Sequence, residues 1–176
     1  DRLPNGNFWL AVHIADVAHY VVPDSALDRE AYERSTSVYF PERAVHMFPS
    51  ELSTGLCSLK PHVDRLVQSC LMEVDRRSGQ VLRYEMHDGI IHSDARMTYT
   101  DVNRVLTDRD PAAIAQYLEL VPMFERMHEL FEVLNARRRR RGSIRCPGRS
   151  GAGCRAPSRL PPTDAKREVG VAVGSP

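Results

Sequence analysis

The 176-residue chain lacks the patterns that are typical of membrane, secreted and redox proteins. No run of about 18 apolar residues occurs, so no membrane-spanning helix is predicted. No basic-then-apolar signal peptide opens the sequence. None of the four cysteines forms a C-x-x-C pair, which favours reduced thiols in a cytoplasmic protein. Cys57 and Cys70 have no charged activating neighbour close in sequence, and we expect buried structural thiols rather than nucleophiles.

The seven histidines show no spacing that stands out as a zinc motif, and no metal ligand is predicted among them. If residues 8–17 form a strand, His13 and Asp16 point to opposite faces and do not easily bind one metal. We expect His13 to be packed and hydrogen-bonded. Asp16 ends the strand, where a polar residue can reach a cleft, and it is kept as a candidate site residue beside the plainer structural role.

Charge is distributed unevenly along the chain. Residues 1–136 carry 13 Lys and Arg against 21 Asp and Glu, whereas residues 137–176 carry 11 against 2. After Gly142 the sequence holds five of the twelve prolines, is rich in Gly, Arg and Ser, and has no periodicity. We therefore expect a folded body over residues 1–142 and a disordered tail over residues 143–176.

The pattern of the body predicts an α+β domain, because strands come first and helices follow. An Asn-Gly turn precedes a largely buried strand over 8–17, and the polar turn "DRRSG" joins two strands of an antiparallel hairpin. Pro122 is expected to kink or divide the last helical stretch. The other expected elements are a helix over 25–35 with Ser25 as N-cap, an extended piece over 36–40, a short helix around 50–53, hairpin strands over 66–74 and 81–92, a helix after Thr98 or Thr100, and helical residues over 110–142.

Two features could contact a nucleic acid. Tyr39 lies in "TSVYFP", where an exposed aromatic ring in a rigid turn can stack on a base; the alternative is a core tyrosine. A run of five arginines closes the last helix, where cations are favoured and phosphates can bind. The alternative for this run is a solvated helix end. The five residues are Arg137, Arg138, Arg139, Arg140 and Arg141.

The longest pattern in the chain resembles the catalytic RNB domain of the bacterial ribonuclease R and ribonuclease II family. The segments "HIADV", "TSVYFP", "GLCSL", "VDRL" and "ARMTYTDV" stand in the family's order, and the resemblance covers residues 2–144, leaning towards ribonuclease R. It implies a fragment of an RNB domain, with antiparallel strands and packed helices. We interpret the abrupt change in composition near Ile144 as a change of reading frame or a broken gene model.

The resemblance implies a Mg²⁺-dependent, processive 3′→5′ exoribonuclease that degrades single-stranded RNA to nucleoside 5′-monophosphates. It places Tyr39 against the 3′-terminal nucleotide. The family's aspartate cluster precedes the position of Asp1, so we expect no metal ligand or catalytic residue here and no activity of the chain by itself. A monomer in the cytoplasm is expected. Two alternatives stay open: a non-catalytic RNA-binding remnant, and a truncated product that does not fold alone.

Overall fold

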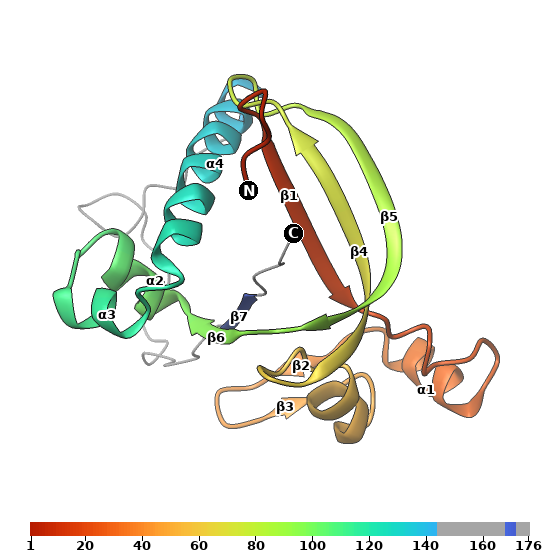
Figure 1. Cartoon of the computed structure of the whole chain (residues 1–176). Coiled ribbons are helices and arrows are strands. Elements are labelled where there is room, and N and C mark those ends of the chain that lie inside the picture. The colour runs from red at the N-terminus through yellow and green to blue at the C-terminus, as the bar shows by residue number, and fades with distance from the viewer. Residues whose placement is uncertain (144–167, 172–176) are drawn as a thin grey trace. The chain divides into compact units, whose positions relative to one another are not determined.

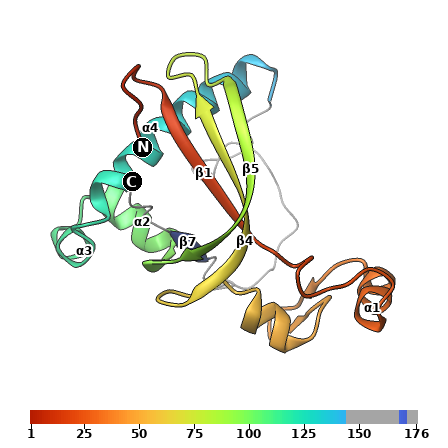
Figure 2. The ribbon, with the colours of Figure 1, turned by 45° about the vertical axis from the view of Figure 1, so that its right-hand side comes forward.

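The computed structural model describes residues 1–143 and 168–171. Figures 1 and 2 show curved strands together with short and long helices, in agreement with the predicted α+β class. The strands are β1 (Phe8–Ala15), β2 (Val38–Tyr39), β3 (Ala44–Val45), β4 (Asp64–Val74), β5 (Val81–His92), β6 (Ala95–Thr98) and β7 (Glu168–Val171). The helices are α1 (Ala26–Arg34), the π-helical turn η1 (Glu51–Leu56), α2 (Tyr99–Leu106), α3 (Pro111–Gln116) and α4 (Val121–Arg140).

The three longest strands form one sheet in the order β1-β4-β5. β4 and β5 are the two strands of the predicted hairpin, and their boundaries agree with the sequence within two residues. In the connecting turn, Asp75 Oδ1 accepts hydrogen bonds from the backbone N–H of Arg77 and Ser78. Gly79 supplies a positive φ of 68°, which a residue without a Cβ adopts at little cost. Turn chemistry therefore fixes the hairpin register.

β1 is far less buried than its sequence predicts, and this expectation was wrong. The Asn5–Gly6 turn precedes the strand as expected, with Gly6 at a φ of 82°. Phe8 alone is fully buried, whereas Val12 and Ile14 are exposed. The reason is that β1 has a strand neighbour on one side only, and the buried cluster around Phe8 takes in only the first part of the strand. An apolar sequence run does not by itself supply the element that covers it.

The helix at residues 26–34 begins where its cap predicts. Ser25 Oγ accepts a hydrogen bond of 3.1 Å from the N–H of Asp28, an acidic residue in the first turn. The short helix expected around residues 50–53 is present as η1, which extends to Leu56 and is π-helical. Its backbone hydrogen bonds include that from the N–H of Cys57 to the carbonyl of Leu52.

The helical stretch after residue 98 consists of three helices. α2 starts directly after Thr98, the last residue of β6. Asp110 caps α3 by accepting a 2.9 Å hydrogen bond from the N–H of Ala112. Pro122 lies in the first turn of α4, where its missing N–H costs nothing, so it divides the stretch rather than kinking a helix.

No helix within the described part of the chain is both long and apolar enough to cross a membrane.

Two shorter sheets complete the strands. β2 and β3 pair antiparallel with Tyr39 opposite Ala44, and β6 pairs antiparallel with β7. β7 lies inside the segment 143–176 for which disorder was predicted, and Glu168–Val171 includes two β-branched valines that suit a strand. The rest of the predicted disorder lies outside the described residues.

The chain divides into two compact units. Unit 1 contains residues 1–10, 72–83 and, among the described residues, 100–143. Its core is a cluster of Phe8, Val74 and Leu130, extended by the partly buried Leu10, Met72 and Val133. Unit 2 contains residues 11–71, 84–99 and the strand β7. Its most buried side chains include Val67, Ser93 and Met97.

Candidate functional site

Tyr39 lies at the end of a two-residue strand and presents its ring to solvent. The N–H of Phe40 donates 2.8 Å to the carbonyl of Arg43, which closes the loop that contains Pro41. Ser37 Oγ accepts 2.9 Å from the N–H of Met47 and holds the other side of the hairpin. Tyr39 is 76% exposed to solvent, and Phe40 is 51% exposed. The alternative of a core tyrosine is therefore wrong, and the ring is accessible to a stacking partner.

Asp16 acts as a local cap in the residues after β1. Its Oδ1 accepts a 3.1 Å hydrogen bond from the N–H of His19, and its own N–H donates a 3.0 Å hydrogen bond to the carbonyl of Leu66.

Burial raises the pKa of the nearby Cys57 thiol, and the negative charge of Asp16 raises it further. Cys57 and Cys70 are half-buried rather than buried as predicted.

His13 is a structural residue, as expected. Its Nδ1 lies 2.7 Å from Ser69 Oγ, so β1 and β4 share a side-chain hydrogen bond. Burial lowers the pKa of His13, which favours the neutral ring.

A histidine–aspartate pair at the far end of the β4–β5 hairpin was not predicted. His92 Nδ1 lies 2.8 Å from Asp64 Oδ1, and the His62 ring centroid is 6.3 Å from that of His92. The predicted hairpin contained part of the signal, because Asp64 and His92 lie at the ends of its two strands that are farthest from the turn. Both side chains are well exposed.

The five arginines occupy the last turn of α4 and its C-cap. Arg137 Nη1 donates a 2.6 Å hydrogen bond to the carbonyl of Gly79, and Arg140 Nη2 donates 3.3 Å to the carbonyl of Ser78. The helix end is thus fastened to the β4–β5 turn, with both partners in unit 1. Guanidinium groups at this position also offset the partial negative charge of a helix C-terminus.

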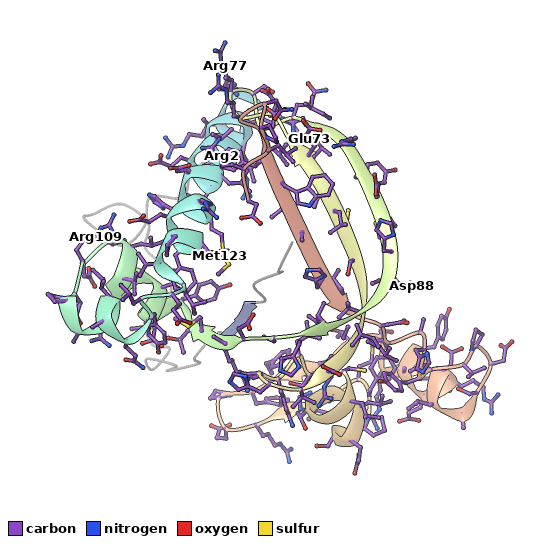
Figure 3. The ribbon with its side chains drawn as sticks, viewed as in Figure 1. Arg2, Glu73, Arg77, Asp88, Arg109 and Met123 are labelled. Atoms are coloured by element: carbon purple, nitrogen blue, oxygen red, sulfur yellow. The ribbon has the colours of Figure 1, made fainter. Side chains whose placement is uncertain are left out.

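Glu73 is the most buried carboxylate of the described residues. It accepts hydrogen bonds from Asn7 Nδ2 (2.7 Å), Asn5 Nδ2 (2.8 Å) and Arg83 Nε (2.8 Å). These donors lower the pKa of Glu73, with the Asn7 bond the largest cause. Figure 3 shows its position on the side-chain view. Since every oxygen contact is a protein donor, the carboxylate serves the fold of unit 1.

A magnesium site does not follow from these side chains. Within residues 1–143 and 168–171, no three His, Cys, Asp or Glu residues lie together in a way that could hold a metal ion. The described residues therefore do not fit the Mg²⁺ that the resemblance implies, and no reaction step can be assigned to them through that ion.

Comparison with known proteins gives the family. Residues 1–168 match the RNB domain, and the chain belongs to the RNB domain family. It is 49% identical over 143 residues to ribonuclease R 1 of Lactococcus lactis and 45% identical over 144 residues to ribonuclease R of Escherichia coli. These alignments cover 81% and 82% of the chain but only 17% and 18% of the relatives. The chain thus spans about a fifth of the length of these relatives.

A solved structure shows the same fold. The structure of Mycoplasma genitalium RNase R in complex with double-stranded RNA matches with a TM-score of 0.69 at 33% identity, covering 82% of this chain and 25% of that one. A second structure of the same protein, in complex with ribose-methylated single-stranded RNA, matches with a TM-score of 0.68. The predicted family and fold, a part of an RNB domain of the ribonuclease R type, are confirmed.

Proposed function

We propose that the chain is part of the catalytic RNB domain of a ribonuclease R-type enzyme that degrades single-stranded RNA processively in the 3′→5′ direction to nucleoside 5′-monophosphates. The observation that carries this proposal is the match of residues 1–168 to the RNB domain. Two of the similar solved structures, both of Mycoplasma genitalium RNase R, are described in complex with RNA, which supports RNA as the substrate. A monomer in the cytoplasm is part of the proposal.

Within this proposal, Tyr39 contacts the base or ribose at the 3′ end of the RNA. The support is physical: the residue is 76% exposed, and its backbone is held by the β2–β3 pairing. An aromatic ring held in this way stacks on any base, with a contribution of about 1–3 kcal/mol per base. Asp16 is not assigned a contact, because its carboxylate already accepts the N–H of His19.

In the proposed parent reaction, Mg²⁺ would activate the attacking water and neutralise charge on the phosphate. Since the described residues hold no candidate set of ligands, we propose that the chain by itself is catalytically inactive. Incubation of the purified chain with a 5′-labelled single-stranded RNA and Mg²⁺ tests this directly. Release of nucleotides above the background of a mock purification contradicts it.

A chimera tests the positive part of the proposal. The 144 residues of E. coli ribonuclease R that align with this chain are replaced by the chain's own matching residues. We expect the chimera to shorten a single-stranded RNA from its 3′ end. Failure of a folded chimera to degrade RNA, while the unaltered E. coli enzyme does so, contradicts the proposal.

Tyr39 is tested in the same chimera. We expect Tyr39→Ala to lower the affinity for the 3′ end of short RNA, so that the final degradation product is longer. We expect Tyr39→Phe, which keeps the aromatic ring, to leave the product length unchanged. Tyr32→Ala is the matched control, because Tyr32 is also a highly exposed tyrosine of unit 2, at 84%. Equal effects of Tyr39→Ala and Tyr32→Ala remove the proposed role of Tyr39.

The second candidate function, a non-catalytic RNA-binding remnant, is favoured by the arginine run. Five cations within one helix end attract phosphates even where no catalytic group is present. For this candidate we expect the chain alone to bind RNA without degrading it. The candidate is contradicted if the chain binds no RNA at low salt.

The third possibility, a product that does not fold alone, predicts the absence of a cooperative thermal transition by circular dichroism.

A further inference from the structure

A cavity of about 500 Å³ lies at the C-terminal end of α4. Six of the described residues line it, all of them in unit 1, and three of these six carry guanidinium groups: Leu134, Arg137, Arg138, Arg141, Gly142 and Ser143. No carboxylate is among these residues. Three like charges around one cavity repel one another, and an anion in the cavity relieves that repulsion.

The five arginines do not have equivalent roles. Arg137 and Arg140 donate to carbonyls of the β4–β5 turn, and only Arg137 of these two also lines the cavity. Arg138 and Arg141 line the cavity, and both residues are exposed. Arg139 is exposed as well but does not line it. The run is therefore divided between anchoring groups and groups that face the cavity.

The backbone at this helix end is already satisfied. The N–H groups of Arg141, Gly142 and Ser143 donate to the carbonyls of Arg137, Arg139 and Arg138 at 3.0–3.3 Å. Gly142 makes this capping possible with a φ of 86°, in the region that glycine adopts without strain. Because these carbonyls accept hydrogen bonds, less of their negative potential opposes an anion at the cavity.

The cavity is held in place by the turn that anchors Arg137. At Gly79 an added Cβ would lie 3.2 Å from Val133 Cγ1, so the turn packs directly against α4. Arg137 is half-buried, and its bond to the Gly79 carbonyl is 2.6 Å long. One wall of the cavity is thus organised before any ligand binds, which lowers the entropic cost of binding.

We propose that this cavity is a phosphate-binding site in which Arg138 and Arg141 donate to the phosphate oxygens and the anchored Arg137 supports them. Guanidinium groups match phosphate geometry and form strong charge-assisted hydrogen bonds. The proposal deepens the proposed function and rests on it for the source of the phosphate, which is the backbone of single-stranded RNA. A free nucleoside 5′-monophosphate presents the same chemistry, and the test separates the two.

The full chain is titrated against a 5′-fluorescein-labelled ten-nucleotide oligoadenylate, with anisotropy as the readout. We expect Arg138→Gln and Arg141→Gln each to weaken binding about tenfold, as for the loss of one charge-assisted hydrogen bond. Arg139→Gln is the matched control, since it removes the same charge from the same helix end. We expect less than a twofold change for it. Equal weakening by all three substitutions overturns the site, because it shows only a diffuse basic field.

Competition separates the sources of the phosphate. Inorganic phosphate and adenosine 5′-monophosphate are added at an ionic strength matched with chloride. We expect both to displace the labelled RNA from the unaltered chain better than chloride does, and to lose this advantage in Arg141→Gln. Displacement no better than chloride overturns the proposal.

A fluorescein-labelled adenosine 5′-monophosphate is also titrated directly. If the monophosphate binds in an Arg141-dependent way while the RNA does not bind at all, the phosphate site stands and the RNA-directed function fails. If RNA binding depends on Tyr39 but is the same for Arg138→Gln, Arg139→Gln and Arg141→Gln, the function stands and the site fails. A far-UV circular dichroism melt of each variant verifies that the exposed substitutions leave the fold intact.

Discussion

Glu73 Oε2 accepts a 2.8 Å hydrogen bond from Nε of Arg83 across the β4–β5 pair, and Arg83 also lies over the Trp9 ring at 5.6 Å. The other carboxylate oxygen of Glu73 accepts from Asn5 and Asn7, in and after the turn that precedes β1. One buried carboxylate therefore ties three separate parts of unit 1 together, and its loss leaves several donors without their acceptor.

Glu73→Gln is expected to lower the melting temperature of the chain clearly. The amide replaces one acceptor oxygen by a donor, which faces donors already present, and an unsatisfied buried polar group is costly. The melt is followed by circular dichroism. Glu119→Gln, at an exposed glutamate of the same unit, is the control and should change the midpoint little. A midpoint shift no larger for Glu73→Gln than for Glu119→Gln contradicts this prediction.

Acid should remove the contribution of Glu73. Hydrogen bonds from Asn7, Asn5 and Arg83 hold the pKa of Glu73 below its ordinary value of 4.5. A carboxylate with a lowered folded pKa stabilises above the unfolded pKa, and the stabilisation is lost as the pH falls below that value. We expect the difference in melting temperature between the unaltered chain and Glu73→Gln to be constant near neutral pH and to shrink below about pH 4.5. A difference that persists unchanged in acid argues against this linkage.

Leu130→Ala should destabilise unit 1 by about 3 kcal/mol, since it removes a side chain buried against Phe8 and Val74 and leaves a cavity. Met127→Ala, one turn earlier on α4 at a residue that is 47% exposed, should cost less than about 1 kcal/mol. Urea unfolding gives both free energies. Similar losses for the two substitutions would show that the cluster around Phe8 is not a core.

Cys57 should react slowly with iodoacetamide at about pH 8, because burial and then the charge of Asp16 raise the pKa of its thiol. The rate is measured by mass spectrometry of the peptide that contains Cys57. Asp16→Asn removes the charge and should accelerate the modification. An unchanged rate in Asp16→Asn would mean that Asp16 does not influence this thiol.

The exposed apolar residues of β1 and β5 should bind the hydrophobic dye ANS. Ile14 is 66% exposed and Tyr84 is 67% exposed, both in unit 2. The double substitution Ile14→Thr with Tyr84→Thr keeps good strand formers and should reduce the dye fluorescence without lowering the melting temperature. Val22→Thr is the control at a residue of unit 2 that is 62% exposed and lies outside both strands. Equal fluorescence in the two variants would contradict a surface patch on these strands.

The elements with local signals were predictable from the sequence. The hairpin over 64–92 is indicated by two apolar runs that flank a polar turn. In this turn the Asp75 side chain accepts a hydrogen bond from the backbone N–H of Ser78. The start of α1 follows in the same way from Ser25 and Asp28. In both cases the interactions join residues close in the chain, so composition and spacing contain the necessary information.

The exposure of β1 and the cavity at α4 depend on distant residues and could not be predicted in this way. Val12 and Ile14 have the same strand propensity whether or not an element covers them. The division of the arginine run depends on the carbonyls of Ser78 and Gly79, about sixty residues earlier. The sequence showed that five cations lie together, but only the fold separates those that anchor the helix from those that face the cavity.

The pairing of Phe8 with Leu130 has a consequence for the order in which the chain can fold. Leu130, the partner of Phe8 in the same buried cluster, is synthesised more than a hundred residues after Phe8. Until then Phe8 lacks this partner, and the contact requires closure of a very long loop. Unit 1 therefore cannot complete the cluster of Phe8, Val74 and Leu130 until α4 has been synthesised.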